Sequence, residues 1–422
     1  MKTFKPICCL QTFILASLIL LCSCSRAGSV SWPNDPDPVV KDTFPKDSNY
    51  IVPDTSKIIE GYLTPSKWYT YSWDDINYSN VTHIVYAFLR PVSAGDPTLT
   101  YGNASEEAAV YGLYPSLTDK THLGYGDKLI AKAHTANVKV LIGIAGGVGR
   151  NAKDLDSIFA NDSLRKQFIG NLITLCESRG YDGVTLDYEY PSSAAEGIGI
   201  TNFAQELRIA FLESAVLAGK NMFITMAVPR GDWAGMYFDY GKLAKCCNWF
   251  SSMTYEFATS WTNRFSFNSP LYTSTSAGAN TAIATTLHYL KDTRGINPLQ
   301  IVIGAPFFGW VFSNYTSLGG TKSTTNGVDK RYTRIYNDYL KNSPTNGYVK
   351  YWNDTCKQSY LVNTSTNEMI TYDDEQALME KCNYIKTNGL KGVMIWEISR
   401  GFLPGTPDPN PLLTVLGSNL LY

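Results

Sequence analysis

Runs of apolar residues alternate with amphipathic stretches along most of the chain. The apolar runs are Ile58–Tyr62, Thr82–Phe88, Val138–Ile144, Gly183–Asp187, Met222–Val228, Trp249–Tyr255, Ile301–Pro306 and Gly392–Trp396. The stretches with helical spacing are Tyr125–Thr135, Leu155–Ser178, Thr201–Leu217, Gly278–Asp292 and Asp374–Asn388. Strands that alternate with helices predict βαβ units and a parallel sheet. Eight such strands favour a closed (β/α)8 barrel, the TIM barrel, over an open sheet, so we expect an α/β fold.

The stretch between the seventh and eighth apolar runs is too long for a single helix. It is rich in Gly, Thr and Ser, and then contains two short strand-like segments at 348–352 and 358–362. We therefore expect a small α+β insertion over residues 311–372, with the barrel formed by 57–310 and 373–422. Active sites of such barrels lie at the C-terminal ends of the strands, so the insertion would wall one side of the cleft.

The N-terminus has the features of a targeting segment. Lys2 and Lys5 precede a mostly apolar run, residues 7–21, which is shorter than a membrane span of about 20 residues. The Leu-Cys-Ser-Cys sequence that ends at Cys24 resembles a bacterial lipobox, which implies a signal peptide over 1–23 and lipidation of Cys24. Residues 24–56 are rich in Pro, Asp and Ser, as in an extended tether. We expect an exported bacterial lipoprotein of the outer membrane, at the cell surface or the periplasmic face; a plain secretory signal or a signal anchor is the alternative.

Composition narrows the classes of function. A net charge of −1 and a pI near 6.4 give no electrostatic case for binding nucleic acid or an anionic membrane surface. Aromatic residues make up 13% of the chain, which is enough to build a core and to offer flat faces for stacking on sugar rings. The four histidines show no metal-ligand spacing, so we expect neither a metal nor another cofactor. The five cysteines beyond Cys24 are expected to be buried free thiols.

Two acidic residues share one face of the fourth apolar run. Thr185, Asp187 and Glu189 alternate with Val184 and other apolar residues, which is the period of a strand. The Cα atoms of Asp187 and Glu189 would lie roughly 6–7 Å apart. Two carboxyls held side by side cannot both ionise freely, so one acquires a raised pKa and can act as a general acid near neutral pH.

This segment resembles the signature of glycoside hydrolase family 18, the chitinases and their relatives, which reads Asp-Gly-x-Asp-x-Asp-x-Glu followed by Tyr-Pro. The chain matches at Asp182, Gly183, Asp187, Glu189, Tyr190 and Pro191 and departs at Thr185, where the family has an inner Asp. Further segments resemble the family: Met253-x-Tyr255, which is followed by Glu256 where the family has Asp, the last strand ending at Trp396, and the third strand, which ends at Gly146-Gly147. In that third strand Gly143 and Ala145 replace a family Ser and Gly. In the family this Ser helps to hold the inner Asp, which is Thr185 here, so the inner relay that these positions form is altered as a unit.

The resemblance covers about residues 57–400 and implies hydrolysis of β-1,4 bonds next to N-acetylglucosamine, in chitin or chito-oligosaccharides, with retention of configuration. The catalytic residues that it implies are Glu189 as general acid, Asp187 as orienter of the substrate acetamido group and Tyr255 as donor to its carbonyl. The substrate-binding residues that it implies are Trp396, Tyr62, Phe88, Met226, Trp261, Gly146, Tyr190, Glu256 and Thr185, with core packing as the alternative for the aromatic ones. We expect a monomer. Other functions that stay open are an endo-β-N-acetylglucosaminidase acting on N-glycans and a non-catalytic glycan-binding lipoprotein.

Overall fold

The computed structural model describes residues 50–64, 70–101, 124–146, 150–214, 216–217 and 219–422. The predicted signal peptide, the lipidation site Cys24 and most of the predicted tether lie outside these residues. Within the described residues no helix is long and apolar enough to cross a membrane. All five cysteines found there are buried and none forms a disulfide: Cys176, Cys246, Cys247, Cys356 and Cys382.

A closed barrel of parallel strands forms the main body, which confirms the predicted fold class. Its strands are β1 (Ile58–Leu63), β2 (His83–Ser93), β4 (Lys139–Gly146), β5 (Gly183–Tyr188), β6 (Phe223–Val228), β7 (Trp249–Ser252), β8 (Ile301–Pro306) and β14 (Gly392–Trp396). The barrel closes where β1 pairs in parallel with β2, Glu60 opposite His83. The end of β2 also pairs with an antiparallel strand, β3 (Asp96–Tyr101), that the sequence pattern does not predict.

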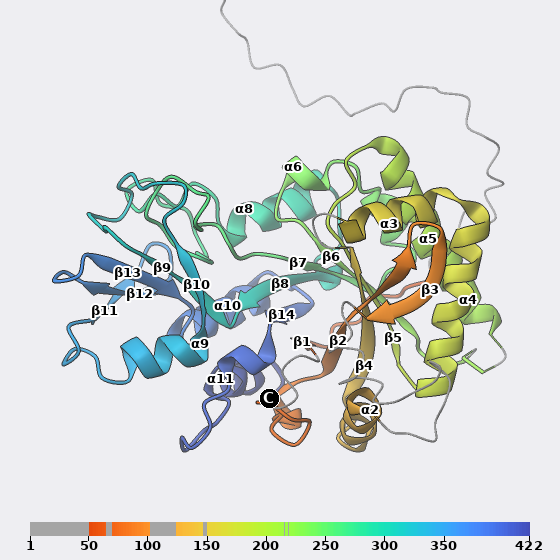
Figure 1. The fold of residues 1–422 in the computed structure, drawn as a ribbon, viewed down its shortest axis with the longest axis horizontal. Coiled ribbons are helices and arrows are strands. Elements are labelled where there is room, and N and C mark those ends of the chain that lie inside the picture. Colours follow the sequence, from red (N-terminus) through yellow and green to blue (C-terminus); the bar gives the residue numbers. More distant parts are fainter. Residues whose placement is uncertain (1–49, 65–69, 102–123, 147–149, 215, 218) are drawn as a thin grey trace, which may run out of the picture. The chain divides into compact units, whose positions relative to one another are not determined.

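Helices cover the outside of the barrel (Figure 1). The long ones are α2 (Tyr125–Thr135), α3 (Arg150–Ala160), α4 (Asp162–Arg179), α5 (Ala194–Glu213), α10 (Glu375–Thr387) and α11 (Pro411–Leu420). The short ones are η2 (Tyr78–Asn80), α6 (Asp232–Gly235), α7 (Tyr240–Leu243), α8 (Ile283–Leu287), η3 (His288–Thr293), η4 (Pro298–Gln300), α9 (Tyr332–Arg334), η5 (Ile335–Leu340) and η6 (Ile398–Gly401). The single helix predicted over Leu155–Ser178 is wrong: the Asn161 side chain accepts hydrogen bonds from the N–H groups of Ser163 and Leu164 at 3.0 Å and starts α4 anew.

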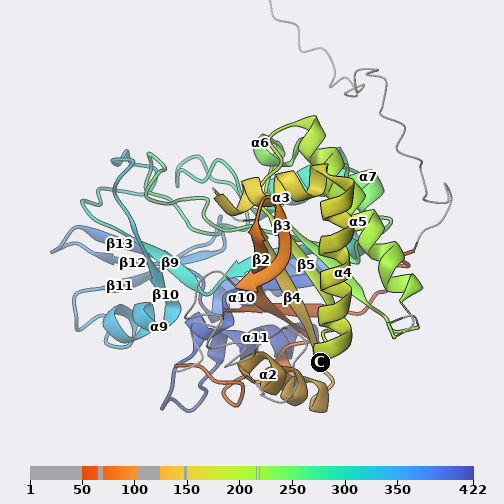
Figure 2. The same ribbon diagram turned by 45° about the vertical axis from the view of Figure 1, so that its right-hand side comes forward.

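A second sheet lies between β8 and β14 in sequence and on the opposite side of the barrel from α4 (Figures 1 and 2). Its strands are β9 (Phe308–Phe312), β10 (Val328–Arg331), β11 (Val349–Asn353), β12 (Gln358–Asn363) and β13 (Glu368–Tyr372), in the antiparallel order β10-β9-β13-β12-β11. Its first strand crosses the boundary predicted at residue 311, because the apolar pattern continues past β8 with only Phe307 between the two strands. Lys381 of α10 forms a buried ion pair with Asp373 at the end of β13, which ties this sheet to the barrel helix.

The barrel interior is built in layers of inward side chains. The lower part is mostly apolar and includes Ile58, Leu141, Trp249 and Val302. Above it, Glu60 and several hydroxyl side chains form a polar layer, and all of them are fully buried: Thr185, Thr225 and Ser251. The upper layer contains Tyr62 and Asp187, two residues further along β1 and β5. Because strand side chains alternate, each of these strands offers one residue per layer to the interior.

Candidate active site

The strand β5 delivers the paired carboxyls to the C-terminal mouth of the barrel. Gly183 begins the strand at a close backbone approach, since a Cβ there would lie 2.2 Å from the carbonyl oxygen of Phe223. Asp182, the first acid of the signature, lies at the opposite end, where its carboxylate accepts a 2.8 Å hydrogen bond from the N–H of Val140. Asp182 therefore contacts the neighbouring strand, away from the end of β5 that carries Asp187 and Glu189.

A cavity of about 230 Å³ opens at this end of the barrel. The residues that line it are Phe88, Asp187, Glu189, Tyr190, Arg230, Met253, Tyr255, Glu256, Phe308 and Trp396. They come from the middle of β2, from the ends of β5, β6, β7 and β14, and from β9 of the second sheet. The lining is therefore an aromatic and apolar wall with carboxyls on one side, which suits an uncharged sugar ring and provides acid–base groups. No group of residues suited to hold a metal ion occurs in the described part of the chain.

The side chains of Asp187 and Glu189 lie within hydrogen-bonding reach of each other, so a proton on one carboxyl can be shared with the other. Burial raises the pKa of Asp187 well above its usual range, and the charges of Glu189 and Glu60 raise it further. Burial also raises the pKa of Glu189, although the hydrogen bonds from Tyr190 and Asp187 oppose part of that rise. One oxygen of Asp187, Oδ1, is buried and accepts no N–H or O–H hydrogen bond from the described residues. We refer to Asp187 and Glu189 as the dyad, because the two carboxyls can share one proton.

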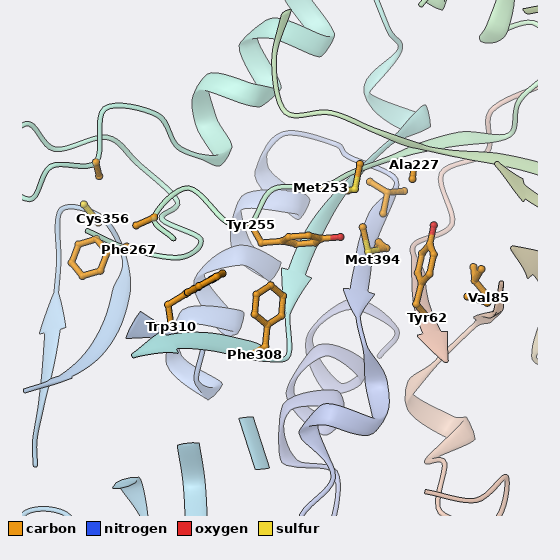
Figure 3. Close-up of a cluster of buried hydrophobic side chains, with 14 of the residues drawn as sticks. Tyr62, Val85, Ala227, Met253, Tyr255, Phe267, Phe308, Trp310, Cys356 and Met394 are labelled. Atoms are coloured by element: carbon orange, nitrogen blue, oxygen red, sulfur yellow. The ribbon is translucent and has the colours of Figure 1, made fainter. Parts of the chain in front are cut away.

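Tyr255 places its ring in the site from the segment after β7. It is 8% exposed, and its ring meets that of Phe308 edge-on at 5.7 Å. Figure 3 shows its hydroxyl end directed toward Met394 and Tyr62. Burial, and then the charges of Asp187 and Glu189, raise the pKa of the Tyr255 hydroxyl well above its usual range. It therefore stays protonated at every working pH and serves as a hydrogen-bond donor.

Glu256 follows Tyr255 in a left-handed backbone conformation, with φ of 60°. Its N–H donates a 3.0 Å hydrogen bond to the side-chain oxygen of Asn268, and its carbonyl accepts one from Arg230 at 3.2 Å. Burial raises the pKa of the Glu256 carboxyl, with Arg230 opposing part of the rise. These contacts hold the backbone while the carboxyl itself lines the cavity.

Three aromatic rings form the apolar side of the site. Trp396 ends β14 and lines the cavity, Tyr62 meets it edge-on at 5.5 Å, and Phe88 stacks on it at 6.0 Å. Tyr62 is 1% exposed, and its hydroxyl has no hydrogen-bond partner. Non-proline cis peptide bonds occur within β2 at Ala87–Phe88 and just after β5 and β14 at Glu189–Tyr190 and Trp396–Glu397.

Some predicted site residues lie away from the cavity. Met226 is fully buried on the face of β6 opposite to Thr225, whose hydroxyl points into the barrel, so the structure does not bring Met226 to the site. Thr185 is buried one layer below Asp187. Trp261 is 58% exposed and does not line the cavity, although its ring meets Trp310 edge-on at 5.5 Å. Gly146 is the last residue of β4, paired with Tyr188 of β5.

Sequence reasoning missed three residues that line the cavity: Met253, Phe308 and Arg230. Met253 belongs to the Met-x-Tyr motif, so the same alternation that assigns Tyr255 could have assigned it. Phe308 lies two residues after the seventh barrel strand, in the part of a barrel where sites form. Arg230 comes after Pro229 at the end of β6, and no local pattern marks it.

Comparison with known proteins places the chain in a family. The model of the family described as glycosyl hydrolases family 18 matches residues 59–401, so the chain belongs to this family. Chitinase A1 of Niallia circulans is 27% identical over 398 residues, and a probable endochitinase of Caenorhabditis elegans is 28% identical over 308. These matches cover 82% and 68% of the chain, which spans only 56% and 49% of those two relatives. Among solved structures, chitinase ChiA74 from Bacillus thuringiensis has the same fold, with a TM-score of 0.75 at 23% identity over 87% of this chain and 70% of that one.

Proposed function

We propose that the protein hydrolyses β-1,4 bonds next to N-acetylglucosamine, in chitin or chito-oligosaccharides, with retention of configuration. The observation that carries this is the hydrogen-bonded pair Asp187 and Glu189 in a cavity faced by Trp396 and Tyr255. A lectin would need the aromatic wall but not a buried acid with a raised pKa. Two carboxyls with perturbed pKa values in one cavity are the mark of acid–base chemistry.

Glu189 supplies the proton for cleavage. Burial raises its pKa and so favours the protonated form, and Glu189 lines the cavity, where its carboxyl can protonate the glycosidic oxygen as the bond to C1 breaks. The resulting carboxylate then takes a proton from the water that attacks C1. Restoring the proton in this way returns the dyad to its starting state.

The nucleophile in this proposal is the acetamido oxygen of the substrate, as in the family exceptions to the two-carboxylate scheme. The vacant Oδ1 of Asp187 is suited to accept the acetamido N–H, which orients the oxygen toward C1 and offsets the positive charge that develops on the ring intermediate. The Tyr255 hydroxyl is suited to donate to the acetamido oxygen. Trp396 supports the sugar face and keeps water out. Two displacements at C1 then give retention.

Chitin is favoured over N-glycans because of the second sheet. Phe308 of β9 joins the cavity lining, and further along β9 the buried Trp310 packs edge-on against the exposed ring of Trp261. An exposed aromatic ring beyond the cavity suits a linear, unbranched chain of identical sugars. The chitinase names of the relatives point the same way.

We also propose that Cys24 anchors the protein as an exported outer-membrane lipoprotein. Support comes from the lipobox-like sequence that ends at Cys24 and from the polar, Pro-rich stretch that follows it. Such a tether would hold the barrel away from the bilayer and leave the cavity open to a polymer.

Hydrolysis of N-acetylglucosamine oligomers, followed by proton NMR in the first minutes, tests the catalytic proposal. We expect the β-anomer to be released first, and mutarotation to follow. Release of the α-anomer would exclude retention. Cleavage of a high-mannose N-glycan with no cleavage of the oligomers would instead favour the endo-β-N-acetylglucosaminidase reading.

A further inference from the structure

Glu60 is a buried carboxyl that the mechanism above does not use. It lies on β1 with no exposed surface. The Ser251 hydroxyl donates a hydrogen bond to its Oε2, and the Trp249 indole N–H donates to Oε1 at 3.4 Å. No cation forms an ion pair with it among the residues that the structure describes. Burying a carboxyl that has only neutral hydrogen-bond donors lowers the stability of the folded protein, so the presence of Glu60 needs an explanation.

Glu60 lies in the same layer of the barrel as the residues of the altered inner relay. The Thr225 hydroxyl lies 3.4 Å from the Glu60 carboxyl and 2.8 Å from the Thr185 hydroxyl. In register, Gly143, Thr185 and Thr225 are neighbours across β4, β5 and β6. Residues 143 and 185 are the two inner positions that depart from the family pattern. The polar layer that has lost a carboxyl at 185 thus holds one supplied by β1.

This layer lies directly below the dyad. Asp187 follows Thr185 by two residues on β5, and Tyr62 follows Glu60 by two residues on β1, so both occupy the next layer up. We propose that Glu60 is a positioning residue that keeps the shared proton on the Asp187–Glu189 dyad at neutral and alkaline pH, in place of a carboxyl at position 185. The inference rests on the proposed glycosidase function.

The negative charge of Glu60 sets the direction in which this residue shifts the pKa of the dyad. Burial raises the pKa of Glu60 to about 7, so it becomes negative as the pH rises through that value. A negative Glu60 raises the pKa of Asp187, and the dyad then keeps its proton to higher pH. The other titratable groups that face this layer stay neutral: burial lowers the pKa of His83 on β2 to about 3, and burial raises those of Tyr62 and Tyr255 well above their usual range.

The pH dependence of kcat/KM for Glu60→Gln on an N-acetylglucosamine oligomer tests the proposal. We expect the alkaline limb to move to lower pH by on the order of one unit, since the dyad loses its proton earlier. Ser251→Ala keeps the carboxyl but removes a donor that stabilises its charged form, so it should move the limb in the same direction by less. Profiles that superimpose on the wild type for both variants would overturn the proposal, and Ser251→Ala decides it alone if Glu60→Gln does not fold.

A second readout needs no substrate. Thermal unfolding of Glu60→Gln, Asp187→Asn and the double variant gives a coupling between the two positions, which we expect to be absent at pH 5 and present at pH 8.5, where Glu60 is charged. Additive shifts in Tm at both pH values would overturn the proposal for any substrate. A wild type that cleaves no N-acetylglucosamine oligomer would overturn the proposed function instead, and the coupling would then decide the role of Glu60.

Discussion

The hydroxyls of Thr185 and Thr225 lie 2.8 Å apart inside the barrel, one layer below Asp187. Their neighbour in the layer is the carboxyl of Glu60, 3.4 Å from Thr225. This contact links the departure from the family signature at 185 to an acidic residue on a different strand. The inner relay is therefore rebuilt from other elements, and a carboxyl is still present below Asp187.

Replacing Thr185 with Asp should crowd two carboxyls into this layer. We expect Thr185→Asp to lower the free energy of unfolding by roughly 1–3 kcal/mol at pH 8, because a second buried carboxyl has no cation to pair with. The pH–rate profile should also change. Adding Glu60→Gln should recover stability, which urea unfolding of both single variants and the double variant measures. Additive losses, or a pH–rate profile of Thr185→Asp identical to the wild type, would contradict this account.

The hydroxyl of Tyr255 should contribute to the chemical step. Tyr255→Phe removes one donor to the developing acetamido charge, so we expect kcat to fall about 10²-fold with little change in Tm. Tyr372→Phe is the matched control, because Tyr372 of β13 is also buried but lies outside the cavity lining. Steady-state kinetics of both variants decide the matter. If the kcat of Tyr255→Phe equals that of the wild type, Tyr255 takes no part in the chemical step.

Trp261 should matter only for long substrates. It is exposed and lies beyond the cavity, against Trp310, so Trp261→Ala should raise KM for hexamers several-fold and leave that for short oligomers near the wild-type value. Tyr272→Ala, which removes an exposed aromatic residue of the same loop region, serves as the control. If the hexamer-to-dimer ratio of KM stays unchanged in Trp261→Ala, Trp261 is a packing residue.

Cys24 should carry the lipid. Metabolic labelling with a radioactive fatty acid should mark the wild type and Cys22→Ala, whereas Cys24→Ala should be unlabelled and should leave the membrane fraction. Labelling that persists in Cys24→Ala would show that the anchor, if any, lies elsewhere.

The strands were predictable because buried parallel strands are continuous apolar runs. β8 and β14 have the predicted bounds. Period two also identified Asp187 and Glu189 as neighbours on one face. The same rule assigns Thr225 and Met226 to opposite faces, whereas the prediction that Met226 binds substrate followed the family motif and not the alternation.

Other features could not be read from local pattern. Glu60 stands alone in an apolar run, and only the closed barrel brings it to Thr225 and Ser251 from strands far away in sequence. Arg230 reaches the cavity through its contacts with the loop after β7. Such tertiary relationships depend on which strands face each other across the barrel, and no window of neighbouring residues contains that information.

The most direct test of the central claim compares the wild type with Glu189→Gln on N-acetylglucosamine oligomers of increasing length. Gln keeps the shape of Glu189 but cannot donate the proton, so we expect cleavage products from the wild type, their loss in the variant, and binding retained by both. Binding by both proteins without products from either would contradict hydrolysis and favour a glycan-binding protein. Equal product release by both would show that Glu189 is not the acid.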